Sequence, residues 1–146
     1  MSSDICLFLS NDGSIEDRVI DWYTDSDWAH CGWLRQSDMW TYSAEHEGGV
    51  KWRPPNAAKI LKLSCDGMDA SISKALTVEG STYDMLDILG IALSKDWSKP
   101  GEFICDKLVF WAYQQINVPL LNHTFIPLIH LKPRDILLSP YVTEIK

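Results

Sequence analysis

The strongest constraint on the fold comes from a segment in the last third of the chain, from about Cys105 to Ile116, which follows Pro100-Gly101. Its apolar residues recur at the i, i+3, i+4, i+7 spacing of one helix face. They are Cys105, Leu108, Val109, Ala112, Tyr113 and Ile116. The spacing predicts a core helix that carries a cysteine in its first turn.

Length and charge limit what else the chain can be. It has 146 residues, 46% of them apolar, and a formal net charge of −7. One core of this size is stable without metal or disulfide bonds, whereas two domains would each be marginal. We therefore expect one domain over residues 1–146, with no cofactor and no metal.

The charge and the apolar pattern also exclude classes of partner. Twenty acidic residues against thirteen Lys and Arg argue against a nucleic-acid partner, because phosphate binding needs a basic surface. No apolar stretch reaches the roughly 18 to 20 residues that a membrane span requires. The amino terminus has no basic region ahead of an apolar run, so we expect synthesis in a cytoplasm without a signal peptide.

The first half of the chain alternates β-favouring stretches with turn signals. Strands are predicted at Ile5–Ser10, Trp28–Arg35, Met39–Ala44, Val50–Arg53 and Ala58–Leu63. Besides the helix at Cys105, helices are predicted over 14–23, 69–76 and 83–93. We expect an α+β fold in which an antiparallel sheet packs against helices, with five tryptophans in the core: Trp28, Trp33, Trp40, Trp52 and Trp111.

The four cysteines are not equivalent. They form no C-x-x-C pair, which excludes a zinc ribbon and a thioredoxin motif. Unsatisfied N–H groups at a helix amino terminus favour the nucleophilic thiolate, and only Cys105 has that position. Cys6 and Cys31 are expected within strands and Cys65 in a strand-to-helix turn, and all three are predicted to be buried thiols.

A nucleophilic cysteine needs a base, and histidine is the usual one. Of His30, His46, His123 and His130, only His30 falls on a predicted strand in apolar surroundings, between two tryptophans. No pair forms an H-E-x-x-H or similar signature, which makes a zinc hydrolase a weak option. His30 is therefore the predicted base.

Six segments, taken in order, resemble the pattern of a known family. They are Asp4–Phe8, Ile20–Gly32, Ser43–Pro54 with its Gly48-Gly49 and Arg53-Pro54, Gly80–Asp84, Phe103–Val109 and Leu131–Ile136. The pattern is that of the circularly permuted papain-like amidases of the NlpC superfamily, the YiiX-like group. In this group an early strand carries the histidine and a late helix carries the cysteine. The resemblance implies a permuted papain-like (NlpC-type) fold.

The resemblance also implies roles for individual residues. Cys105 is the nucleophile and His30 the base. The third polar residue falls at Ser43, where many relatives have Glu, and Glu45 or His46 is an alternative. Ser43 and Glu45 share a strand face because side chains alternate with a period of two. Substrate contacts are assigned to Trp28, Tyr83, Asp84 and Asp106, although Asp106-Lys107 stands where Ser-Glu is common in the family.

By resemblance, the expected activity is that of a cysteine amidase or endopeptidase that forms a thioester and cleaves peptidoglycan peptides. Association with phage tail proteins in a virion is the expected setting. Two alternatives stay open. One is a lipid acyltransferase or thioesterase, like the relatives of lecithin retinol acyltransferase, although the chain shows neither an anchoring helix nor a basic surface stretch. The other is an inactive structural or binding module of a virion, for which Ser43 is the clue.

Overall fold

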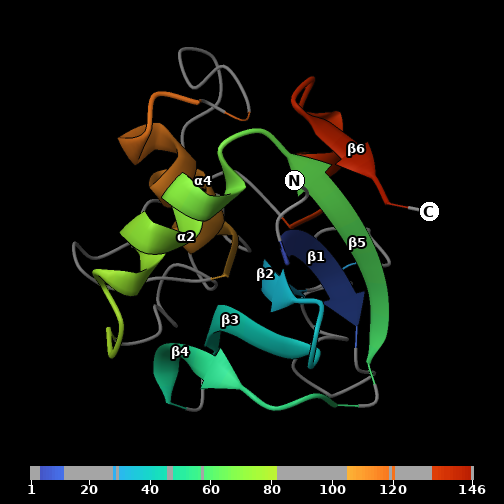
Figure 1. The fold of residues 1–146 in the computed structure, drawn as a ribbon, viewed down its shortest axis with the longest axis vertical. Coiled ribbons are helices and arrows are strands. Elements are labelled where there is room, and N and C mark those ends of the chain that lie inside the picture. The colour runs from blue at the N-terminus through green and yellow to red at the C-terminus, as the bar shows by residue number, and fades with distance from the viewer. Residues whose placement is uncertain are drawn as a thin grey trace, which may run out of the picture.

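The computed structural model describes residues 4–11, 28, 30–45, 48–56, 58–81, 105–118, 120 and 133–145. Its strands are β1 (Ile5–Asn11), β2 (His30–Arg35), β3 (Trp40–Glu45), β4 (Gly49–Arg53), β5 (Lys59–Cys65) and β6 (Val142–Glu144). The helices are α2 (Met68–Leu76) and α4 (Cys105–Gln115), with a 3-10 helix, η2 (Pro133–Leu138). Figure 1 shows these elements in one view.

The strands form one antiparallel sheet of order β4-β3-β2-β1-β5-β6. Strands β2, β3 and β4 follow one another as the predicted meander, and the Gln36-Ser37-Asp38 segment forms the first turn. Strand β1 lies in the middle, where Phe8 pairs with Gly32 of β2 and with Lys62 of β5. The expected α+β class with an antiparallel sheet is therefore confirmed.

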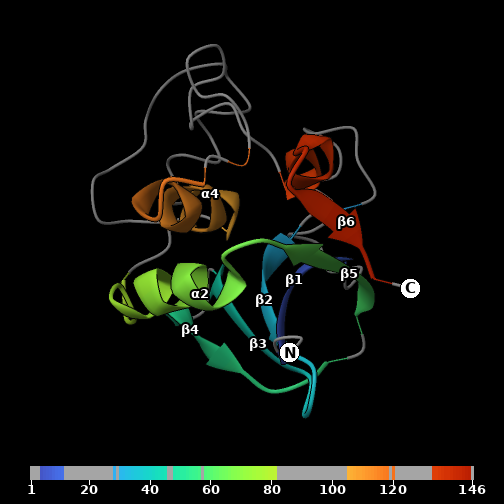
Figure 2. The same cartoon turned by 45° about the horizontal axis from the view of Figure 1, so that its top comes forward.

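The two faces of the sheet bury different sets of side chains. Alternate residues of a strand point to opposite faces, so Cys31 and Trp33 belong to the main core with α2 and α4. Figure 2 shows both helices on the same side of the sheet. Leu34 joins a smaller cluster with Cys6 and Phe8. Residue His30 alternates with Cys31 and so belongs to the face of this smaller cluster.

The direction of α4 across the sheet follows from its contacts. The hydroxyl of Tyr113, late in the helix, contacts the thiol of Cys65 at the end of β5. Because β5 is antiparallel to β1, that end lies beside Ile5, which pairs with Arg35 at the end of β2. A helix rises about 1.5 Å per residue, and α4 packs on β2 and β3. The part of α4 that contains Tyr113 therefore lies toward the end of the sheet where β2 ends with Arg35.

Most predicted elements are confirmed with small shifts of their ends, and three details were wrong. Met39 occupies the turn with φ 62, so β3 begins one residue later than expected. Cys65 is the last residue of β5, because that strand extends to pair with β6. Trp40 was expected in the core but is 37% exposed, since it starts β3 beside the turn. Strand β6 and the 3-10 helix η2 were not predicted.

Two predictions of helices, over 14–23 and 83–93, lie outside the described residues. Within the part of the chain that the structure describes, no helix has the length and apolar character that crossing a membrane requires.

Candidate functional site

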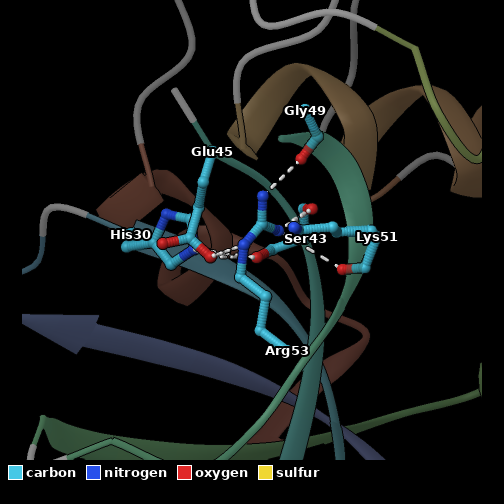
Figure 3. Close-up of polar contacts among 6 residues, drawn as sticks. All are labelled: His30, Ser43, Glu45, Gly49, Lys51 and Arg53. Carbon is cyan, nitrogen blue, oxygen red and sulfur yellow. Dashed lines mark hydrogen bonds and ion pairs between the residues drawn. The ribbon is translucent and has the colours of Figure 1, made fainter. Parts of the chain in front are cut away.

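The site is built around His30, the first residue of β2. Its imidazole is largely buried, with 17% of the side chain exposed, and its ring centroid lies 5.8 Å from that of Phe8 on the neighbouring strand. The Nε2 atom lies 3.0 Å from the Ser43 Oγ and 3.8 Å from Oε2 of Glu45. Figure 3 shows both side chains on the same side of the ring. The sequence predicts that Ser43 or Glu45 lies beside His30, and in the structure both do.

Ser43 and Glu45 share a face of β3 because they are two residues apart. The Ser43 hydroxyl donates a hydrogen bond to Oε2 of Glu45 over 3.3 Å. The two residues were expected to be alternatives for one position. Instead, both lie within reach of the same nitrogen of His30, and Ser43 is the nearer.

This arrangement excludes Ser43 as a nucleophile paired with a carboxylate-oriented histidine. In a serine triad the hydroxyl and the carboxylate contact different ring nitrogens, whereas here Ser43 and Glu45 both approach Nε2. Ser43 is also fully buried.

Arg53 is a site residue that the sequence reasoning did not assign. Its Nε lies 2.8 Å from Oε2 of Glu45. Its terminal nitrogens donate to main-chain carbonyls of Ser43 at 2.8 Å, Lys51 at 3.3 Å and Gly49 at 2.7 Å, as Figure 3 shows. Its signal in the sequence was the Arg53-Pro54 pair within the family pattern. We call His30, Ser43, Glu45 and Arg53 the His30 cluster.

The absence of a side chain at Gly32 permits the close packing beside His30. A Cβ at this position would lie 2.4 Å from the Tyr42 carbonyl oxygen, 2.8 Å from Cβ of Ser43 and 3.1 Å from Phe8. Ser43 belongs to the His30 cluster and Phe8 lies beside it, whereas the Tyr42 contact is with the main chain. Glycine therefore lets β2 and β3 approach closely enough for Ser43 to reach the imidazole.

Cys105 is the first residue of α4. Its side chain and that of Asp106 fall outside the described residues, as do Tyr83, Asp84 and His46. Trp28 packs beside the main core, with the Lys59 ammonium 5.2 Å from its ring centroid. The roles of all these residues stay predictions.

The other three cysteines are buried and form no disulfide. Burial raises the pKa of the Cys6 thiol to about 11. Burial also raises the pKa of Cys65, although a hydrogen bond with Tyr113 opposes this. The burial of all three confirms the expectation that they are core residues.

Within the described residues, no three His, Cys, Asp or Glu side chains gather in a way that could hold a metal ion. The His30 cluster itself contains one histidine and one carboxylate, which are joined through Ser43 and Arg53.

Comparisons with known proteins bear on the fold. No protein-family model matches the sequence, and no curated protein does. Among solved structures, the chain is similar to the crystal structure of metalloprotein YiiX from Escherichia coli O157:H7, with a TM-score of 0.66 and 18% sequence identity. The match covers 97% of this chain and 94% of YiiX. The chain therefore has a YiiX-like fold, as its motifs predicted.

Proposed function

We propose that the protein is a cysteine hydrolase of amide bonds, with Cys105 as nucleophile and His30 as base. The observation that carries this proposal is the arrangement of His30. Its Nε2 lies 3.0 Å from the Ser43 hydroxyl, and its strand β2 packs against α4, the helix that begins with Cys105. Nucleophilic catalysis by a thiol requires a histidine base that is held in one orientation.

The helix supplies two further contributions. Unsatisfied N–H groups in the first turn of a helix favour an anion nearby and so lower the pKa of a thiol there. The same N–H groups can donate to the oxygen of a tetrahedral intermediate. Position on α4 thus distinguishes Cys105 from Cys6, whose burial raises its pKa.

The reaction proceeds by two acyl transfers. The thiol proton of Cys105 passes to the imidazole of His30, and the thiolate attacks the amide carbon, forming a C–S bond. The C–N bond then breaks and the amine leaves with the proton from the imidazolium. Water gives a proton to His30 and attacks the thioester, which releases the acid and restores the Cys105 thiol when that proton returns to sulfur.

For the substrate we propose a peptide amide in the stem peptide of peptidoglycan, with Trp28, Tyr83, Asp84 and Asp106 lining the cleft. Phage tail proteins are the proposed partners. Both proposals rest on the family that the six sequence segments resemble. The YiiX-like fold supports the family assignment at the level of architecture.

Purified full-length protein and soluble stem peptides test the proposal. Wild type should release new amino groups, and Cys105→Ala should abolish that release. His30→Ala should slow it by about 10² to 10⁴-fold, the usual range for a general base. Cys65→Ala, at a buried thiol remote from His30, is the matched control and should retain the rate. Equal cleavage by Cys105→Ala and wild type would refute the assignment.

Two further measurements separate the alternatives. Transfer of an acyl chain from a phospholipid, with no peptide cleavage, would identify a lipid acyltransferase. Alkylation of Cys105 by iodoacetamide at pH 7, compared with that of Cys6, tests for a thiolate. Equal rates at the two thiols would favour an inactive binding module.

A further inference from the structure

We propose that the ammonium of Lys51 binds a carboxylate of the substrate, so that the site prefers acidic peptides. This inference rests on the proposed function, because it names the class of peptide that the protein would cleave. Lys51 is an exposed residue in the middle of β4. Three features point to this role: its place on the sheet, the course of its side chain and the charges near it.

Strand pairing places Lys51 on the same face of the sheet as the His30 cluster. Lys51 pairs with Ser43 of β3, and side chains directly opposite in paired strands are neighbours. Arg53 lies two residues further along β4 and shares the face because side chains alternate. Lys51 therefore belongs to the face on which Ser43 contacts His30, and Figure 3 shows it beside the cluster.

The side chain of Lys51 extends back along β4 toward the residues that face His30. A Cβ added at Gly48 would lie 2.6 Å from both Cε and Nζ of Lys51, so the ammonium rests against Gly48. The next residue, Gly49, pairs with Glu45, whose carboxylate is 3.8 Å from His30 Nε2. Only β3 separates β2 from β4, and neighbouring strands are 4.7–4.9 Å apart, so the ammonium lies about 10 Å from the imidazole.

Glycine at position 48 keeps room for this ammonium. The φ of Gly48 is 81, in the left-handed region that favours glycine. Any larger residue would place its Cβ against the end of the Lys51 side chain. The Gly48-Gly49 pair therefore leaves the cation accessible at the edge of the His30 cluster.

Lys51 adds a positive charge that no described carboxylate offsets. Within the cluster, Arg53 Nε lies 2.8 Å from Oε2 of Glu45, so these two charges compensate each other. In the part of the chain that the structure describes, no carboxylate forms an ion pair with Lys51. The whole chain carries a net charge of −7, which repels anions, so an acidic substrate needs a local cation of this kind.

The distance limits where the carboxylate can lie in the substrate. An extended peptide advances about 3.3 Å per residue. A carboxylate bound by Lys51, about 10 Å from the His30 ring, is therefore about two to three residues from the amide that is cleaved. The ammonium donates to it as a charge-assisted hydrogen bond.

The test measures peptide binding by the full-length protein with Cys105→Ala, which removes the nucleophile and hence cleavage. The ligands are a soluble stem peptide with a free carboxylate two to three residues from an internal amide and the same peptide with that carboxylate converted to a primary amide. Calorimetry at low salt should show that the carboxylate form binds about fivefold more tightly, the upper range for one exposed ion pair. The preference should decrease as salt rises.

Variants of Lys51 identify the cation. In the same background, Lys51→Met should reduce the affinity ratio to about one, Lys51→Glu should reverse the preference, and Lys51→Arg should retain it. Lys62→Met is the matched control. Lys62 lies on the same sheet face, where it pairs with Phe8, but its charge acts on Cys6, so this variant should keep the parent ratio.

The inference and the proposed function can fail separately. An equal ratio in Lys51→Met and its parent would overturn the inference, as would equal affinity of the parent for the two peptides or no binding of either. Absence of cleavage by wild type would refute the proposed function, and a preference that depends on Lys51 would then still identify an acidic-peptide site. Cleavage by wild type with the same kcat/KM for both peptides would support the hydrolase and overturn the role of Lys51.

Discussion

Two fully buried serines, Ser71 on α2 and Ser43 on β3, make a similar pair of contacts with different results. The Ser71 hydroxyl accepts a hydrogen bond from the Trp33 indole at 3.0 Å and donates to the Met68 carbonyl at 2.8 Å. Ser43 contacts His30 at 3.0 Å and donates to Glu45. Each hydroxyl thus joins two polar groups.

The difference lies in what the partners can do. The indole N–H and the main-chain carbonyl near Ser71 do not titrate, so their bonds stabilise the packing of α2 on β2. Both partners of Ser43 can change protonation state, and Arg53 holds one of them. Ser71 also contacts the hydroxyl of Tyr113, whose pKa burial raises, so its partners stay neutral, whereas those of Ser43 include an imidazole and a carboxylate.

The largest expected effect comes from Gly32→Ala, which disturbs the surroundings of Ser43 and leaves those of Ser71 unchanged. The new Cβ would lie 2.4 Å from the Tyr42 carbonyl and 2.8 Å from Cβ of Ser43, so β2 and β3 must separate. Overpacking of this kind should lower the free energy of unfolding by about 3 kcal/mol. Urea denaturation measures the loss, and the ¹⁵N NMR spectrum of the His30 ring should change with it. A fully stable variant with an unaltered spectrum would contradict the close approach.

Ser71→Ala should separate stability from the state of His30. It leaves the buried Trp33 N–H without its acceptor, at a cost of about 1–3 kcal/mol in the free energy of unfolding. The ¹⁵N NMR spectrum of the His30 ring should stay as in wild type, because Ser71 lies on the other face of the sheet. Urea denaturation and this spectrum measure the two effects. A change in the spectrum would mean that the two serines are coupled through the sheet.

The fold was largely predictable from local patterns. Alternation of apolar residues and turn signals located β1 to β5, and the helical period located α4. These signals are local, so they do not need knowledge of the partner strand. Strand β6 has three residues, of which Val142 is half-buried. It forms because the edge of β5 is available for pairing. No pattern within its own three residues reveals that partner.

The candidate site was predictable in part. His30, Ser43 and Glu45 were found because motifs and strand alternation place them near one another. Arg53 was missed because its role depends on main-chain carbonyls of its own strand, at Gly49 and Lys51, that converge on one guanidinium. Such convergence of main-chain atoms leaves no residue-type signature except the arginine itself.

The Cys6 thiol shows the effect of burial on a cysteine that lies on the same sheet face as His30. Burial raises its pKa from the ordinary 9.0 to about 11. The folded state therefore retains the proton where the unfolded chain loses it. This contribution to stability is fully present below pH 9 and declines as pH rises from about 9 to 11.

The measurement compares urea unfolding at pH 8 and pH 10.5 in wild type and Cys6→Ala. Wild type should lose more stability between the two pH values than the variant does. Burial also raises the pKa of Tyr42, Tyr113 and Cys65, so the variant should retain part of the alkaline loss. An identical loss in both proteins would show that Cys6 does not ionise on unfolding in this range.

The smallest effect is expected for Asp38→Asn, where an ion pair resembles that of Arg53 and Glu45 in chemistry but not in setting. Arg35 binds Asp38 at 2.8 Å and lowers the pKa of that carboxyl through a hydrogen bond, yet both groups lie on the surface. Water and salt screen such pairs, and their net contribution is small. Asp38→Asn should therefore leave the urea midpoint and the His30 spectrum unchanged, whereas Glu45→Ala changes the spectrum. If the two variants behaved alike, burial and the carbonyl contacts of Arg53 would not be what distinguishes the His30 cluster from an ordinary surface pair.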